Sequence, residues 1–254
     1  MNLEELNPKK RFSSRTNNYA KYRPGYPNEI ISYLIEFTGL SKTSVIADIG
    51  SGTGICTKTF LDNGNTVYAV EPNEDMRQVA EHLLETYDNF HSIDGSSENT
   101  KLKSESVDII IAAQAFHWFD PKPTKEEFLK ILRPNGVVVL LWNIRNVKSD
   151  GFMQEYLELI ERYGENYTSE SNGDIMPKFF DYRTIHKKVF NNPQLADFDR
   201  LKGELASFSY IPNESNPNFQ PMISELQDLF DKYNSNNGNV VLEYETHLYY
   251  CKIK

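Results

Sequence analysis

One stretch of ten residues, 45–54, constrains the fold more than any other part of the chain. It reads Val-Ile-Ala-Asp-Ile-Gly-Ser-Gly-Thr-Gly, an apolar run that passes into three glycines at alternate positions. A short β-branched run that ends in glycines is typical of a buried strand followed by a tight turn. Residues 55–61 are compatible with a helix that ends at Asn63-Gly64. The stretch therefore predicts a strand, turn and helix whose free backbone amides face a ligand.

The spacing of the glycines indicates which ligand this turn suits. A dinucleotide fingerprint, G-x-G-x-x-G, would need glycine at position 55, where the sequence has Ile55. Glu71 ends the next predicted strand, 66–70, and an acid at that position can accept from both hydroxyls of a ribose. Such an acid suits any adenosyl ligand, so by itself it does not distinguish a dinucleotide from another adenosyl cofactor. A turn without a ligand is the weaker interpretation, because three glycines weaken local structure unless something approaches closely.

Three motifs resemble those of a known enzyme family. Asp48-x-Gly50-x-Gly52-x-Gly54 resembles the first motif of the class I S-adenosylmethionine-dependent methyltransferases. Residues 114–120, Gln-Ala-Phe-His-Trp-Phe-Asp, resemble the element after the fourth strand in the type 11 methyltransferases and in the group that includes trans-aconitate methyltransferase. Residues 19–27 resemble a segment that covers the cofactor in a subgroup of these enzymes. The resemblance is most specific over 45–142 and weakest over 151–198.

The resemblance implies an α/β fold, a Rossmann-like doubly wound sheet of seven mostly parallel strands with a terminal antiparallel hairpin and a small helical cap. The continuous apolar run 107–113 fits a parallel strand that is buried on both faces. The predicted hairpin consists of 240–244 and 247–253, and a further possible strand, 187–190, is placed in the cap.

We expect one methyltransferase domain over residues 1–254, because no internal repeat or low-complexity linker interrupts the sequence. Its expected parts are an N-terminal flap and helix (1–40), a cofactor-binding core (41–148), a cap or insert (149–212), and a C-terminal helix and strand pair (213–254).

Composition narrows the classes of partner. The net charge of −9 and the lack of a basic stripe argue against nucleic-acid binding. The first residues lack the layout of a signal peptide, and the longest apolar runs are too short to span a bilayer. Two cysteines and five scattered histidines predict neither a disulfide framework nor a metal site. We expect a cytoplasmic monomer or homodimer without membrane or metal, which binds a small-molecule methyl acceptor and S-adenosylmethionine and releases S-adenosylhomocysteine.

The resemblance also assigns cofactor contacts. Arg23 would meet the methionine carboxylate, since guanidinium groups pair bidentately with carboxylates, and Pro72 and Met76 would flank the adenine. The family commonly has an acid for the adenine amine at the position of Ser96, which leaves a backbone contact from Ser97 or a bond through Ser96 or Asp94. The full set of expected cofactor residues is Tyr22, Arg23, Asp48, Gly50, Ser51, Gly52, Thr53, Gly54, Glu71, Pro72, Met76, Ser96, Ser97 and Gln114.

Aromatic and polar residues near the expected crevice are candidates for the acceptor pocket. His117 is the candidate base if the acceptor is a hydroxyl or a protonated amine; otherwise it orients its loop through a hydrogen bond. A carboxylate acceptor needs no base, but it would need partners such as Arg23, Tyr22, Arg145 or Tyr210. The expected pocket residues are Tyr19, Tyr26, His117, Trp118, Trp142, Asn143 and Tyr210.

Two other functions stay open at the level of sequence. An NAD-linked oxidoreductase shares the strand, turn and helix, although Ile55 disfavours it. A non-catalytic adenosyl-ligand-binding regulatory protein would share the fold and the cofactor site. Its sign would be a mouth blocked by residues 19–26, with no acceptor cavity beside the methyl position.

Overall fold

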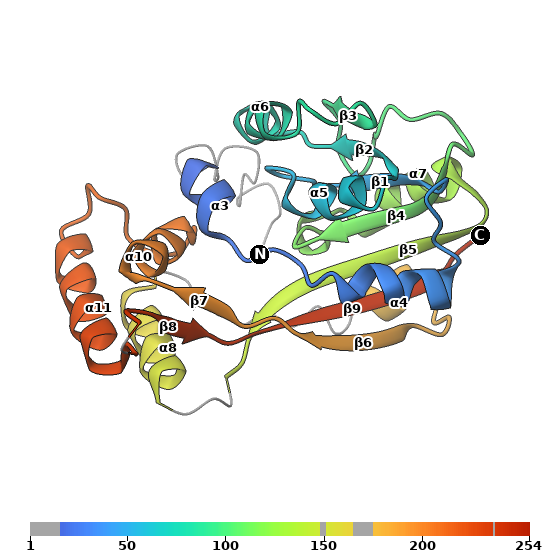
Figure 1. The fold of residues 1–254 in the computed structure, drawn as a ribbon. Coiled ribbons are helices and arrows are strands. Elements are labelled where there is room, and N and C mark those ends of the chain that lie inside the picture. Colours follow the sequence, from blue (N-terminus) through green and yellow to red (C-terminus); the bar gives the residue numbers. More distant parts are fainter. Residues whose placement is uncertain (1–15, 148–150, 165–174, 236) are drawn as a thin grey trace.

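A seven-stranded sheet forms the centre of the larger lobe in the computed structural model, which describes residues 16–147, 151–164, 175–235 and 237–254 (Figure 1). The strand order is β3-β2-β1-β4-β5-β9-β6. The five strands from β3 to β5 are parallel, whereas β9 runs antiparallel to both β5 and β6. The strands are β1 Val45–Ile49, β2 Thr66–Val70, β3 Phe90–Ile93, β4 Val107–Ala113, β5 Leu132–Arg145, β6 His186–Asn191 and β9 Tyr244–Lys252.

The order of the parallel strands places the switch point of the sheet beside the glycine-rich turn. The chain continues from β1 to β2 on one side, and it later adds β4 on the other side of β1. Ligands of such sheets bind outside the carboxyl ends of the strands at this switch point. Asp48, which pairs in register with both Ala69 and Ile111, lies at that end of β1.

Helices cover both faces of the sheet because the strands between them are apolar on both sides. Ile30, Leu34 and Phe60 pack on one face, whereas Phe116, Phe128 and Phe179 pack on the other. The elements around the sheet are α4 Glu29–Thr38, α5 Ile55–Asp62, α6 Glu74–Leu83, the 3₁₀ turn η2 Phe116–Trp118, α7 Pro121–Ile131 and α9 Ile175–Phe179.

A second lobe, the cap, has its own apolar core at the left of Figure 1. Tyr156, Leu205 and Met222 belong to this core and come from three different helices. Helix α3 (Thr16–Tyr22) packs on the cap closely enough that a Cβ added to Gly203 would lie 2.2 Å from the ring of Tyr22. The cap consists of α8 Phe152–Tyr163, β7 Gln194–Ala196, α10 Phe198–Ser207, α11 Phe219–Tyr233 and β8 Val240–Leu242.

The predicted terminal hairpin is wrong. Strand β8 pairs with β7 in the cap, and β9 runs as a single strand between β5 and β6. The seventh strand of the sheet is β6, which covers the stretch 187–190 that we had placed in the cap. Residues 243–246 read Glu-Tyr-Glu-Thr and hold no turn-forming residue, so the chain continues in extended form instead of reversing.

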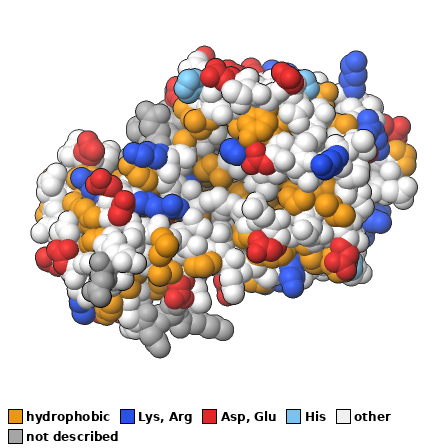
Figure 2. Space-filling model, viewed as in Figure 1, with side chains coloured by type: hydrophobic (Ala, Val, Ile, Leu, Met, Phe, Trp, Pro, Cys, Tyr) orange, Lys and Arg blue, Asp and Glu red, His pale blue; other side chains and the backbone are white. Residues whose placement is uncertain are grey.

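The surface carries mixed charge. Figure 2 shows acidic and basic side chains interspersed on the face that it draws. Over the residues that the structure describes, no helix is both long and apolar enough to cross a membrane.

Candidate functional site

The glycines of the turn after β1 differ in what surrounds them. All three have positive φ, a conformation that side chains rarely adopt. A Cβ on Gly50 would lie 2.7 Å from Cβ of Ala115, so packing excludes a side chain there. A Cβ on Gly52 would meet nothing in the described chain closer than the sulfur of Met76 at 3.8 Å. The open side of Gly52 therefore faces the space in which a ligand can approach the backbone.

Glu71 fixes this turn. Its Oε2 accepts from the backbone N–H of Gly52 at 2.9 Å, and its Oε1 accepts from that of Asn73 at 2.7 Å. Burial raises the pKa of Glu71, and the two backbone donors act in the opposite direction. Each carboxylate oxygen keeps a further lone pair. The acid expected to bind a ribose therefore also holds the glycine-rich turn to the start of α6.

Asp48 leaves one carboxylate oxygen without a partner. Thr57 donates to Oδ2 at 2.6 Å, whereas Oδ1 is buried and accepts no hydrogen bond within the described residues. Burial raises the pKa of Asp48 to about 7, with a further contribution from the nearby charge of Glu71. The buried hydroxyl of Thr53 is also unpartnered. Since buried polar groups are normally hydrogen-bonded, these two atoms fit a ligand that brings its own polar groups.

Helix α6 and the loop after β3 supply the expected adenine side. Asn73 caps the helix by accepting from the N–H of Met76 at 2.9 Å, and the side chain of Met76 is buried beside Gly52. The hydroxyls of Ser96 and Ser97 both bond to Glu98, whose pKa these bonds lower although its partial burial acts in the opposite direction. The serine hydroxyls are thus engaged with Glu98. A backbone contact to adenine remains compatible with this arrangement.

The loop after β4 contains Gln114, whose backbone and side chain fix its path, and the candidate residue His117. Gln114 adopts a positive φ of 55°, and its side chain donates to the carbonyl of Asn143 at 3.0 Å. The ring of His117 lies 4.8 Å from that of Trp118 and makes no hydrogen bond within the described chain. Its side chain is exposed at the surface, yet crowding by neighbouring protein atoms lowers the pKa of the imidazole to about 4. His117 is therefore neutral and only weakly basic at neutral pH.

The two candidates at the end of β5 make different contacts. Trp142 packs edge-on against Phe116 and Tyr249, in the core on the α7 face of the sheet. The side-chain amide of Asn143 donates to the carbonyls of Pro24 and Gly25, both at 3.1 Å. A second amide, that of Asn192, also donates to Gly25 at 2.8 Å. Asn143 and Asn192 thus hold the N-terminal segment against the sheet, a role that the sequence did not indicate.

Residues 19–27 connect the glycine-rich turn with the cap. Burial raises the pKa of Tyr26, and the nearby charges of Asp48 and Arg23 also act on it, so Tyr26 lies near both residues. Arg23 donates through Nε to the hydroxyl of Ser207 at 2.9 Å, and its guanidinium lies 4.8 Å from the ring of Tyr19. Arg23 therefore lies at the junction of the two lobes.

A buried polar cluster lies in the cap next to Arg23. Arg145 donates to the hydroxyl of Tyr210 at 3.2 Å, and Tyr244 donates to Oε1 of Glu204 at 2.6 Å. Nε of Arg145, the hydroxyl of Tyr156 and Oε2 of Glu204 are buried and have no hydrogen-bond partner in the part of the chain that the structure describes. Sequence reasoning found Arg145 and Tyr210 but missed the other three residues. One signal was present: Glu204 falls among the apolar positions of helix α10.

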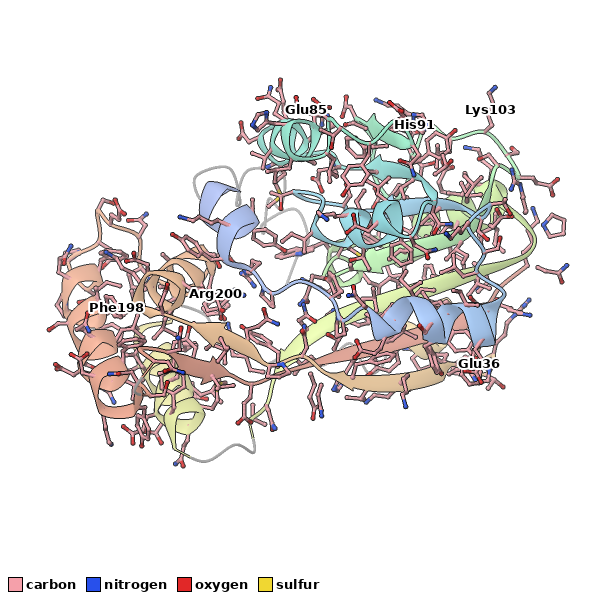
Figure 3. All side chains as sticks on the ribbon, in the orientation of Figure 1. Glu36, Glu85, His91, Lys103, Phe198 and Arg200 are labelled. Carbon is pink, nitrogen blue, oxygen red and sulfur yellow. The ribbon has the colours of Figure 1, made fainter. Side chains whose placement is uncertain are left out.

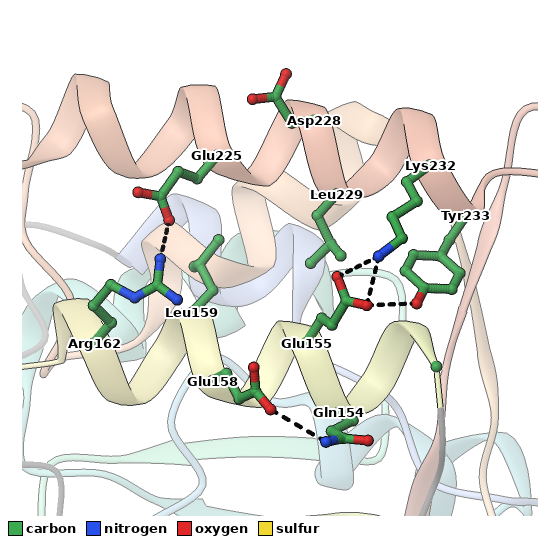
Figure 4. A pocket seen from close by; sticks show the side chains of 11 residues that line it. Gln154, Glu155, Glu158, Leu159, Arg162, Glu225, Asp228, Leu229, Lys232 and Tyr233 are labelled. Atoms are coloured by element: carbon green, nitrogen blue, oxygen red, sulfur yellow. Dashed lines mark hydrogen bonds and ion pairs between the residues drawn. The ribbon is translucent and has the colours of Figure 1, made fainter.

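A groove of about 590 Å³ on the outer side of the cap is a different feature (Figure 4). It runs between α8 and α11, far from the glycine-rich turn in Figure 1. Ion pairs cross it, from Glu155 to Lys232 at 2.7 Å and from Arg162 to Glu225 at 2.6 Å. These charges satisfy one another, so the groove is not a candidate catalytic site.

Comparisons with known proteins agree on one family. Residues 47–140 match the type 11 model of the methyltransferase domain. An uncharacterized methyltransferase of Schizosaccharomyces pombe is 26% identical over 221 residues, which cover 85% of this chain and 86% of that protein. A Saccharomyces cerevisiae protein named as an S-adenosylmethionine-dependent methyltransferase is 28% identical over 151 residues, which cover 58% of this chain and 50% of that protein.

A solved structure assigned as a type II methyltransferase from Anaeromyxobacter dehalogenans shares the fold. Its TM-score is 0.69 at 20% identity, and the match covers 91% of this chain and 98% of that structure. The expected seven-stranded Rossmann-like fold is confirmed. Together with the glycine-rich motif, these matches disfavour the oxidoreductase alternative and identify the chain as an S-adenosylmethionine-dependent methyltransferase, whose residues 47–140 match the type 11 methyltransferase domain.

Proposed function

We propose that this methyltransferase transfers the methyl group of S-adenosylmethionine to an oxygen, a nitrogen or a carboxylate of a small molecule held between the glycine-rich turn and the cap. One observation carries the proposal. The six buried side-chain atoms that lack a partner in the described chain fall into two groups. Asp48 and Thr53 lie at the turn, whereas Arg145, Tyr156, Arg200 and Glu204 lie in the cap.

The residues at the turn fit the cofactor, which supplies a methyl group made electrophilic by its sulfonium. Oδ1 of Asp48 would accept from the ammonium group, and Arg23 would pair with the carboxylate. Glu71 would accept from the ribose hydroxyls with its remaining lone pairs, while Pro72 and Met76 would flank the adenine. Gly52 allows the close approach that this arrangement needs.

The main task of the protein would then be alignment. Holding two reactants in a productive geometry can supply on the order of 7 to 11 kcal/mol. His117, with its pKa near 4, is a weak proton acceptor, so it would orient the acceptor or its own loop more than it would deprotonate an amine. A carboxylate acceptor would need no base. The sequence resemblance to the group that includes trans-aconitate methyltransferase supports a small acceptor of this general kind.

A small acceptor suits the placement of the site better than a macromolecule does. Helix α3 and residues 19–27 run from the sheet to the cap, and Arg23, Asn143 and Asn192 tie them down. A site covered by this segment would bury most of a small ligand. The unpartnered polar atoms in the cap favour a second ligand beside the cofactor over a protein that binds the cofactor alone.

The test is calorimetric titration with S-adenosylhomocysteine and, in parallel, with NAD. Gly52→Ala should abolish S-adenosylhomocysteine binding, because a methyl group would occupy the ligand's approach. Gly64→Ala is the matched control: Gly64 also has positive φ, 94°, but its Cβ would meet nothing closer than 4.0 Å and it lies outside the site. Binding of NAD alone, or equal losses in the two variants, would contradict the proposed site. Turnover of small acceptors would then be followed by the release of S-adenosylhomocysteine.

A further inference from the structure

Two arginines of the cap junction share one aromatic ring. The guanidinium carbon of Arg145 lies 4.0 Å from the ring centroid of Phe208, and that of Arg23 lies 4.4 Å from it. Among the residues that the structure describes, no carboxylate lies within ion-pair distance of either guanidinium. Stacking on a ring stabilises each cation, but it does not remove the repulsion between them. The pair is therefore short of negative charge.

One acid, Glu204, lies near these arginines and makes no ion pair with them within the described chain. It is fully buried, and its Oε1 accepts from the Tyr244 hydroxyl. Burial raises its pKa, and the nearby arginines oppose this effect. A third cation, Arg200 (Figure 3), lies on α10 and bonds to the neutral amide of Gln194 at 2.7 Å, while its Nε is buried without a partner. Three guanidinium groups thus lie near one buried acid.

Buried water could fill the hydrogen-bonding capacity of these atoms, but it would not balance the charge. An anion would do both. Arg145 is the residue best placed to bind one: Tyr210 takes one of its N–H groups, Phe208 packs against the guanidinium, and the N–H at Nε has no partner among the residues that the structure describes. Such a planar, oriented guanidinium suits the paired oxygens of a carboxylate or a phosphate.

We infer that Arg145, with the Tyr156 hydroxyl beside it, forms a subsite for an oxyanion of the methyl acceptor, either a carboxylate or a phosphate group. This inference rests on the proposed function, in which Arg23 takes the carboxylate of the cofactor and so leaves Arg145 for the acceptor. Glu204, through its unpartnered oxygen, would accept from a donor group on the same molecule.

The experiment measures anion binding separately from cofactor binding. Protein saturated with S-adenosylhomocysteine is titrated calorimetrically with malonate and with glycerol 3-phosphate, and then with their uncharged analogues, malonamide and glycerol. The inference expects saturable binding of at least one anion and none of its uncharged analogue. Malonate alone would identify a carboxylate subsite, and glycerol 3-phosphate alone a phosphate subsite.

Three variants test whether Arg145 forms the anion subsite. Arg145→Met should weaken the anion that binds by roughly 10- to 100-fold, the usual effect of losing a charged hydrogen-bonding partner. Tyr156→Phe keeps the ring and should weaken the same anion by a few-fold, a smaller loss because its hydroxyl is uncharged. Arg133→Met is the control: Arg133 also belongs to β5, but it is paired with Asp108 at 2.8 Å at the far end of the strand. Affinity for S-adenosylhomocysteine should be unchanged in all three.

The outcomes separate the two proposals. Failure of S-adenosylhomocysteine to bind the wild-type protein would overturn the proposed cofactor site, and the anion titrations on the free protein would still test the subsite. The subsite itself would be overturned if neither anion bound more tightly than its uncharged analogue. Equal losses in Arg145→Met and Arg133→Met, with unchanged melting temperatures, would also overturn it.

Discussion

The turn after β1 and the cap differ in how far the protein supplies hydrogen-bond partners for their buried polar groups. At the turn, Glu71 is satisfied on both oxygens by backbone N–H groups two and nineteen positions away, so a local stretch of chain completes the arrangement. In the cap, Arg145, Tyr156 and Glu204 come from three separate elements and keep unpartnered atoms. The difference is one of degree, because Asp48 and Thr53 at the turn also keep an unpartnered atom each. It supports the proposal that the turn clamped by Glu71 holds the cofactor and that the cap holds the acceptor.

The largest effect should come from the packed side of the turn. Gly50→Ala adds a methyl group 2.7 Å from Cβ of Ala115 at a φ of 69°, so it combines steric overlap with backbone strain. We expect a loss of about 2–4 kcal/mol in the free energy of unfolding, measured by urea denaturation. Gly64→Ala, which has the strain without the overlap, should cost about 1 kcal/mol. Equal losses would remove steric packing as the reason for Gly50.

A smaller effect should come from the cap. Tyr244→Phe removes the hydroxyl that donates to the buried carboxyl of Glu204 and should lower the free energy of unfolding by about 1–3 kcal/mol. Tyr249→Phe, which removes a hydroxyl elsewhere on β9, is the control. The comparison between the lobes would weaken if Tyr244→Phe were as stable as the wild type, since Glu204 would then not depend on its one partner.

The third prediction concerns pH. The buried carboxyl of Asp48 has a pKa of about 7 in the free protein, and a bound ammonium group would favour its ionised form. Affinity for S-adenosylhomocysteine should therefore rise with pH, roughly tenfold between pH 5.5 and pH 7. Asp48→Asn should remove most of this slope, leaving any contribution of Glu71, whose pKa is also raised. A slope that persists unchanged in the variant would assign the titration to another group.

The smallest effect should come from residues 19–27, which connect the glycine-rich turn with the cap. Asn192→Ala removes the bond to the carbonyl of Gly25, and Asn143 still holds the same segment. We expect a loss of about 0.5–1.5 kcal/mol in stability and an increase in proteolytic cleavage within residues 19–27. Unchanged cleavage would show that Arg23 and Asn143 suffice to hold the segment.

The sequence predicted the turn well because its determinants are local. Asp48, the alternating glycines and Glu71 lie at strand ends, and strand periodicity with turn chemistry locates those ends. The N-cap of α6, where Asn73 accepts from the N–H of Met76, has the same local character. The roles of these residues in binding remain predictions, since the geometry agrees with them without testing them.

The cap could not be predicted in the same way. Its core joins α8, α10 and α11, and helix α10 was not predicted at all, although Asp197 caps it by accepting from the N–H of Arg200. The error in the terminal hairpin has a related origin. Both β8 and β9 are rich in strand-forming residues, so propensity alone could not show that one joins β7 and the other joins β5.

The clamp formed by Glu71 also affects the thermodynamics of ligand binding. Because Gly52 is already held before any cofactor arrives, the turn loses little conformational entropy when the cofactor binds. The ordering of this glycine-rich backbone takes place when the chain folds. Under the proposed function, Glu71 is thus a preorganising residue, and its replacement should make cofactor binding entropically less favourable, apart from any loss of the proposed ribose contact.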